Sequence, residues 1–255
     1  MIPGAKVTDN NVGGIVDYIL EQNKAQQKPV ASLAFKGTVI SASPSAPKVA
    51  SFSSRGPNLI TPEILKPDVI APGVKILAAW TGDASPSGLE FDQRRVKFNF
   101  ISGTSMACPH VSGIAAMLRA AHPKWTPAAV KSALMTTAYN SDKAGKPITD
   151  QATGEVSTPF KHGAGHVDPN KASHPGLVYD IQPSDYDAFL CSMGHSQKQM
   201  SLFTKDRKVD CELHKLSAGP GDLNYPSFSV VFKSFNNSIT YKRVVTNVGS
   251  LLVAT

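Results

Sequence analysis

The sequence of 255 residues contains no long apolar run and no repeated or low-complexity segment. No window approaches the ~18 apolar residues of a membrane helix, so we expect no membrane span. The start, Met-Ile-Pro-Gly, lacks the basic stretch and apolar core of a signal peptide, so none is expected within these residues. The net charge of +7 (26 basic against 19 acidic residues) is scattered and not interleaved with aromatic residues, which argues against a nucleic-acid partner. With 41 % hydrophobic residues, the composition is that of a globular protein of one large or two modest domains.

Cysteine is scarce, with three residues at positions 108, 191 and 211. None has the Cys-x2-Cys spacing of a metal site, and the odd number leaves at least one thiol unpaired within the chain. Cys191 and Cys211 are the plausible disulfide pair, closing a loop of about 20 residues in an oxidising compartment. Two reduced cysteines are the alternative that the sequence leaves open.

The residues around Ser105 predict a strand, a tight turn and a helix. Phe98, Phe100 and Ile101 suit a buried strand, Gly103 permits a close turn, and apolar residues then recur at helical spacing. Pro109 is expected in the first turn of that helix, where proline is tolerated. Ser105 would then lie at a helix N-terminus, where free N–H groups favour a developing negative charge. This is a suitable place for a nucleophile with an oxyanion site, although a serine there also commonly serves as a helix N-cap.

Two other motifs are excluded at this position. The nucleophile elbow of α/β-hydrolases has glycine two residues after its serine, whereas Ala107 stands here. A phosphate-binding loop would end in Gly-Lys-Ser/Thr, which is absent.

Residues 103–113, Gly-Thr-Ser-Met-Ala-Cys-Pro-His-Val-Ser-Gly, closely resemble the signature around the nucleophilic serine of subtilisin-like serine proteases. The blocks at 46–58, 66–80 and 160–180 also resemble plant subtilases. The resemblance implies a secreted serine endopeptidase of the extracellular space (apoplast), acting on peptide or protein substrates through Ser105 without a cofactor. It also implies that Phe52 and the loop 53–57 line the leaving-group side of the cleft.

The same resemblance suggests an α/β fold in four parts. Residues 1–45 would be the tail of a protease-associated insertion, and 46–180 the C-terminal half of the catalytic domain, a partial parallel sheet with flanking helices. Residues 181–221 would connect to the start of a fibronectin type III-like β-sandwich at 222–255. Hydrophobic patterns and capping residues predict helices at 9–23, 126–137 and 185–193, and strands within 30–35, 38–40, 46–51, 74–80, 228–232 and 239–245. The segment 81–97 is expected to be a surface loop with solvated Arg94 and Arg95.

Other side chains are candidates for catalytic or metal-binding groups. Asp68 lies next to proline and is expected to be a turn carboxylate, since the family's catalytic aspartate lies upstream in another motif. His162 and His166 stand four residues apart near Asp168, but glycines at 163 and 165 break any helix that would align them, so no metal site is expected. Cys108 is expected to be a small buried thiol near the cleft, not a nucleophile.

The sequence supplies a nucleophile without its activators. A serine needs an oriented histidine base, a carboxylate and oxyanion donors, yet no histidine precedes His110, and His110 lies on the same helix as Ser105 on the wrong side. Neither the family's aspartate and histidine motifs nor its oxyanion asparagine matches anything before Ser105. We therefore expect the isolated chain to be inactive and, with exposed sheet edges, marginally stable or prone to aggregate. A non-catalytic truncated product or protein-binding scaffold is the alternative.

Overall fold

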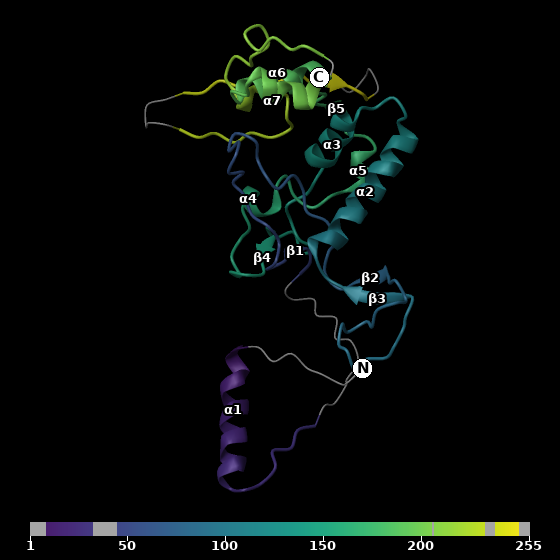
Figure 1. The fold of residues 1–255 in the computed structure, drawn as a ribbon, viewed down its shortest axis with the longest axis vertical. Coiled ribbons are helices and arrows are strands. Elements are labelled where there is room, and N and C mark those ends of the chain that lie inside the picture. The colour runs from purple at the N-terminus through teal and green to yellow at the C-terminus, as the bar shows by residue number, and fades with distance from the viewer. Residues whose placement is uncertain (1–8, 33–44, 206, 233–237, 250–255) are drawn as a thin grey trace. The chain divides into compact units, whose positions relative to one another are not determined.

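The computed structural model describes residues 9–32, 45–205, 207–232 and 238–249. The chain divides into two compact units, residues 1–44 with 79–98, and residues 45–78 with 99–255. The longer helices are α1 (Asp9–Lys24), α2 (Thr104–Ala121), α3 (Pro127–Thr136), α6 (Pro183–Ser192) and α7 (Gln197–Thr204), and the short ones are α4 (Pro159–His162), α5 (Pro169–Ala172) and the 3-10 turn η1 (Pro220–Asp222). The strands are β1 (Lys48–Val49), β2 (Ile76–Ala79), β3 (Phe98–Ile101), β4 (Thr149–Asp150), β5 (Leu177–Val178) and β6 (Thr246–Asn247) (Figure 1).

Short strand pairs make up the sheet structure of the described residues. β1 and β4 are parallel, with Lys48 opposite Thr149 and Val49 opposite Asp150. A further parallel bridge joins Ile70 to His166. β2 pairs with β3, and β5 pairs with β6 in the antiparallel direction. Parallel pairing between segments separated by helices is the arrangement expected of an α/β fold.

Helices α2, α3 and α5 enclose one core cluster. Leu118 of α2 is buried against Val130 and Leu134 of α3, together with Val167 and Ala172. Thr126 caps α3, because its hydroxyl accepts from the N–H of Ala129 at 3.0 Å, and Pro127 opens the helix. The helix predicted at 126–137 is therefore confirmed, with its cap and its buried side.

The other face of α3 packs into a second core cluster, which contains residues near the C-terminal end. Tyr225 and Leu223 are buried with Ile64, Met135 and Ile181. A third cluster, at α6 and α7, consists of the buried residues Cys191, Met200 and Val209 with half-buried Leu190 and Cys211. Residues far apart in the sequence thus share cores within the unit that contains Ser105.

The remaining helix predictions are also confirmed. α1 covers the predicted helix at 9–23, although its apolar side chains at 12, 15, 16, 18, 19 and 20 are all exposed. α6 covers the helix predicted at 185–193, and Gly194 follows its C-cap with a φ of 80°. Among the described residues, no helix is long and apolar enough to cross a bilayer.

Several strand predictions are wrong. Residues 30–32 are irregular, and the rest of the strands predicted at 30–35 and 38–40 lies outside the described residues. Residues 228–232 and 239–245 form no strand, because β structure requires a hydrogen-bonded neighbour and neither run has a ladder partner in the described part of the chain. The expected strands at 46–51 and 74–80 are present as β1 and β2.

Two details of the predicted loops and turns need correction. Arg94 is half-buried, not simply solvated, because its guanidinium forms an ion pair with Asp92 at 2.6 Å. Pro109 lies inside α2, beyond its first turn, since the helix already begins at Thr104. A proline there has no N–H to give to the Ser105 carbonyl four residues earlier. Helix α2 nevertheless continues through it, supported by its packing against α3.

Candidate active site

Ser105 is the second residue of helix α2 and is exposed. The N-cap of this helix is Gly103, and no side chain caps it, so the N-cap role considered for Ser105 is excluded. Because the helix begins at Thr104, N–H groups of its first turn lack the i−4 acceptor of a helix interior, and that of Met106 donates to the Gly103 carbonyl at 3.0 Å. Ser105 therefore lies at the positive end of an 18-residue helix.

A neighbouring loop holds the turn that precedes Ser105. The N–H of Gly103 donates to the carbonyl of Gly73 at 2.8 Å, and the N–H of Lys75 donates to the Ser102 hydroxyl at 2.8 Å. A Cβ at Gly73 would lie 2.8 Å from the Gly103 carbonyl oxygen. Glycine at 73 thus permits the close approach that fixes the start of the helix.

His110 serves the helix and not the serine. Its Nδ1 lies 2.7 Å from the carbonyl oxygen of Met106, one turn back on α2. His122 is stacked on Trp125 with ring centroids 3.9 Å apart, and its Nε2 contacts the Ser173 carbonyl. Within the described ranges, no hydrogen bond joins a histidine to Ser105.

His162 and His166 have separate partners. Nδ1 of buried His162 lies 2.9 Å from the Ser157 hydroxyl, whereas Nδ1 of His166 lies 3.0 Å from the Val167 carbonyl. Helix α4 ends at His162, and Gly163 follows with a φ of 62°, which is the predicted break. Burial lowers the pKa of both imidazoles. In the described part of the chain, no group of three His, Cys, Asp or Glu side chains is arranged to hold a metal ion.

Asp68 is a structural carboxylate, as predicted. It accepts from Lys66 Nζ at 2.7 Å and from the Tyr225 hydroxyl, and its backbone carbonyl accepts from Ala164 N at 2.9 Å. Burial and the Asp68 carboxylate strongly raise the pKa of Tyr225. The side chain therefore ties the loop before β2 to the segment that follows η1.

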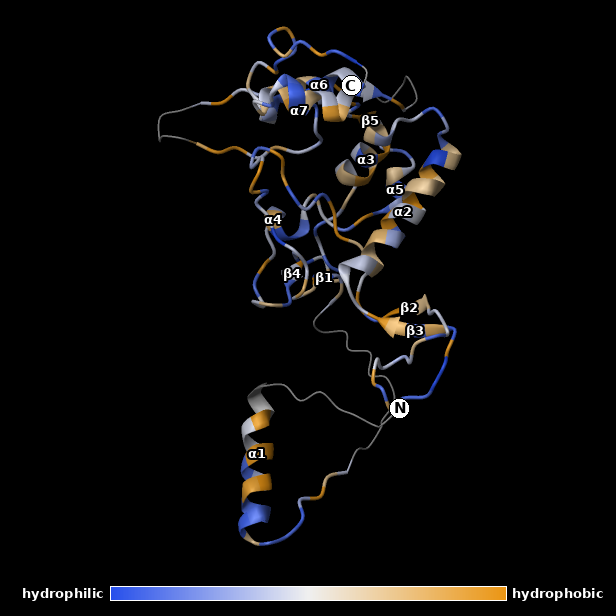
Figure 2. Ribbon diagram, viewed as in Figure 1, coloured by the Kyte–Doolittle hydropathy of each residue, from blue (hydrophilic) through white to orange (hydrophobic). Residues whose placement is uncertain are grey.

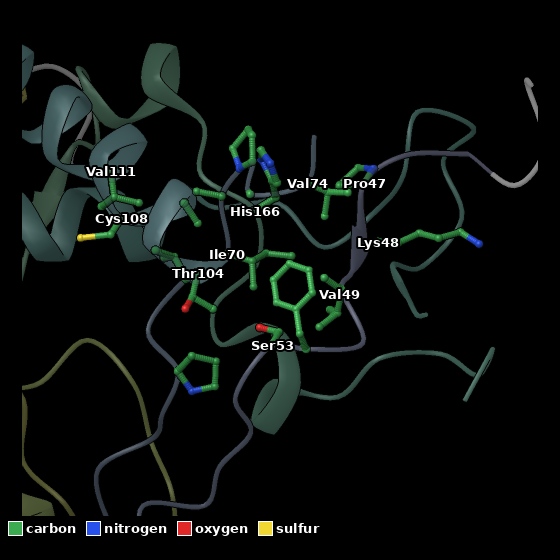
Figure 3. A pocket seen from close by; sticks show the side chains of 18 of the residues that line it. Pro47, Lys48, Val49, Ser53, Ile70, Val74, Thr104, Cys108, Val111 and His166 are labelled. Carbon is green, nitrogen blue, oxygen red and sulfur yellow. The ribbon is translucent and has the colours of Figure 1, made fainter. Parts of the chain in front are cut away.

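The cysteines divide as the sequence suggested, with one correction. Cys191 and Cys211 form a disulfide that links α6 to the segment after α7. Cys108 is free and exposed, so the expectation of a buried thiol is wrong. Cys108 is one of the residues around the neighbouring hollow, and Figure 3 shows its sulfur turned away from the hollow.

A cavity of about 610 Å³ lies beside the start of α2. One wall is formed by β1 and Phe52, Ser53 and Ser54 of the following loop, and the opposite wall by Thr104, Ala107 and other residues of α2. Figure 3 shows Val49 and Ile70 facing this hollow, whereas Lys48 points away. Ser105 itself does not line it. The loop after β1 and the first turn of the serine helix thus share one mostly apolar hollow, consistent with the placement expected for Phe52.

Sequence reasoning missed one buried charged cluster near this cavity. The carboxylate of Asp150 is fully buried and forms ion pairs with Arg55 at 2.8 Å and Lys161 at 2.6 Å. Burial raises the pKa of Asp150, but hydrogen bonds from Lys161, the Ala152 N–H and Arg55 outweigh it and lower the pKa to about 2. Asp150 and Arg55 lie 95 positions apart in the sequence, so no local motif reveals the cluster.

Comparison with known proteins gives the context for this geometry. The subtilase family model matches residues 12–165. Three subtilisin-like proteases of Arabidopsis thaliana align over nearly the whole chain: SBT1.4 with 59 % identity over 249 residues, SBT1.7 with 55 % over 233, and SBT1.3 with 52 % over 251. The alignments cover 97 %, 91 % and 98 % of this chain, respectively. The chain spans about a third of the length of these relatives, 31 % in the case of SBT1.4. Since the model covers more than half of the chain and includes the helix that carries Ser105, this protein belongs to the subtilase family of serine proteases.

Proposed function

We propose that Ser105 is the nucleophile of a serine endopeptidase that cleaves peptide bonds through an acyl-enzyme. The observation that supports this most directly is the position of Ser105, exposed in the first turn of α2, within a block typical of subtilase nucleophiles. Its hydroxyl attacks the scissile carbonyl, and the N–H groups at the helix start stabilise the oxyanion that forms. The substrate is an extended peptide or protein segment.

The proton of Ser105 must pass to a base that these 255 residues do not provide. His110 is engaged with the Met106 carbonyl, and no other histidine bonds to the serine in the described residues. We propose that a histidine, its aspartate and an oxyanion asparagine come from polypeptide outside this sequence. The chain alone is then a nucleophile without activators, and we expect it to be proteolytically inactive.

The experiment is a chimeric protease in which this chain replaces the 249 aligned residues of SBT1.4. We expect it to hydrolyse a fluorogenic peptide, and Ser105→Ala to lower turnover by about six orders of magnitude, the loss known for subtilisin, a member of this same family, when its serine or histidine is removed. Ser112→Ala is the matched control, because this exposed serine lies on the same helix and its hydroxyl donates to the Cys108 carbonyl of that helix at 3.0 Å. Equal activity of the Ser105→Ala variant and its parent would refute the proposal.

A second arm uses the chain alone. A fluorophosphonate probe should label Ser105 at the background rate, because no base activates the hydroxyl. Labelling of the isolated chain at the rate of the chimeric protease would show that the base lies within these residues. If the chimeric protease is inactive while the chain still binds an intact partner, the scaffold alternative is favoured.

We also propose that the protein is secreted into the extracellular space. The Cys191–Cys211 disulfide supports this, because such bonds persist in oxidising compartments. The domain boundaries at 45, 180 and 221, and the fibronectin type III-like character of residues 222–255, stay predictions. Hydrogen exchange in the chimeric protease tests the latter, since protected amides at 228–232 would indicate strands there.

A further inference from the structure

A fully buried aspartate is tied to the loop that faces the serine helix. We propose that Asp150 is a positioning residue that, through Arg55, holds the 51–57 loop in place on the leaving-group side of Ser105. The inference rests on the proposed function, since it assigns a role within that reaction.

Asp150 is surrounded by donors. Its Oδ1 accepts from Arg55 Nη2 at 2.8 Å and from the Ala152 N–H at 3.0 Å, and its Oδ2 is ion-paired with Lys161 at 2.6 Å. The backbone is fixed too, because Asp150 lies in β4 opposite Val49 of β1. The carboxylate is therefore held rigidly from strand, turn and helix α4, and its burial makes an unpaired partner costly.

Arg55 transmits this position to the loop. Its Nη2 binds Asp150, while its Nη1 donates to the Ser53 carbonyl at 2.8 Å and to the Ser51 carbonyl at 3.3 Å. A planar guanidinium can bind a carboxylate and two carbonyls at once, which a lysine ammonium does with less definite geometry. One side chain thus joins the buried carboxylate to two backbone groups of the loop.

The far end of the loop is anchored to the same group of elements. The N–H of Gly56 donates to the Phe160 carbonyl at 2.8 Å, next to Lys161 on α4. A Cβ at Gly56 would lie 2.1 Å from the Lys66 carbonyl oxygen, so only glycine fits. Both ends of the loop are therefore fixed by contacts that converge on Asp150 and α4.

The held part of the loop lies beside the start of the serine helix. Phe52, Ser53 and Ser54 line the same hollow as Thr104 and Ala107, the residues on either side of Ser105 and Met106. In this proposal the wall contacts the part of the peptide that departs, and a misplacement of about 1 Å in a substrate-positioning group can cost ~100-fold in rate. Asp150 would act on the reaction through this wall, without touching the substrate.

The test compares two substrates of the chimeric protease. One is a peptide that extends beyond the scissile bond, and the other carries the same acyl part on a small coumarin leaving group. For Asp150→Asn we expect kcat/KM for the extended peptide to fall by about 10- to 100-fold, with the coumarin substrate changed by less than about threefold. Arg55→Lys should show the same difference between the two substrates to a smaller extent, because lysine keeps the positive charge but lacks the planar guanidinium with its several N–H donors.

The matched control is Asp187→Asn. Asp187 is also buried and pairs with Arg207 at 2.7 and 3.2 Å, but on helix α6, and it does not line the hollow. Asp187→Asn should affect the two substrates equally. If Asp150→Asn also lowers both equally, in proportion to its lost thermal stability, the role is only structural and the inference is wrong. The Ser105→Ala variant tests the proposed function separately. If Ser105 is not the nucleophile, this variant still cleaves both substrates, whatever the result for Asp150→Asn.

Discussion

The Cys191–Cys211 disulfide makes a quantitative prediction about the stability of helices α6 and α7. The bond closes a loop with a sequence separation of 20 residues, which includes helix α7. Constraint of a loop of that length is worth about 3 kcal/mol of unfolding free energy in the chain-entropy model. Because Cys191 is only 1 % exposed and packs on Met200, replacement of both cysteines by alanine should also lose some packing.

The assay is hydrogen exchange of the α6 and α7 amides in the chimeric protease, in the parent and in the Cys191→Ala/Cys211→Ala variant. Local opening that is about 3 kcal/mol easier corresponds to exchange about 160-fold faster in these helices. Cys108→Ala is the control, since that thiol is free and exposed. Unchanged exchange in α6 and α7, in the double variant or in the reduced parent, would refute the reasoning.

Three further predictions concern charge, a buried hydroxyl and the exposed apolar surface. The pKa of Asp150 is about 2, below its ordinary 3.8, so its contribution to stability is present above pH ~4 and is lost as pH falls towards 2. Urea unfolding measured from pH 5 to 2 should therefore show an unfolding free energy that falls less steeply with pH in Asp150→Asn than in the parent. Parallel curves of unfolding free energy against pH would contradict this. Tyr225→Phe removes the hydrogen bond from the Tyr225 hydroxyl to the Asp68 carboxylate and should lower the free energy of urea unfolding by about 1.5–3 kcal/mol. Tyr241→Phe should lower it by less, and equal losses in the two variants would contradict a structural role for the Tyr225–Asp68 bond. The chain alone should self-associate, because Leu77 and Phe100 on the β2–β3 pair are 60 % and 69 % exposed; sedimentation of a stable monomer would refute this.

The distribution of apolar residues in Figure 2 illustrates this last point. Strand β3 is apolar apart from Asn99, and yet its phenylalanines are largely exposed in the described structure. The sequence pattern predicted a buried strand there, and the strand is present. Its burial requires a neighbour, so local pattern predicted the element but not its environment.

Local sequence signals were sufficient where a single segment determines its own structure. The cap at Thr126 and the proline after it predicted the start of α3, and the glycine at 194 predicted the end of α6, because capping depends on residues within one turn; α6 begins at Pro183, two residues before its predicted start. The block around Ser105 predicted a turn and helix for the same reason. The two runs near the C-terminal end failed as strands, since β structure depends on a partner that local sequence cannot supply.

The sequence by itself determined the family, the nucleophile candidate and the lack of a histidine before it, because these are encoded in contiguous residues. Only the tertiary structure showed that Gly103, not Ser105, caps α2, that Cys108 is exposed, and that His110 is engaged by its own helix. It alone brought Asp150 to Arg55 across 95 positions, since packing joins segments that the order of residues keeps apart.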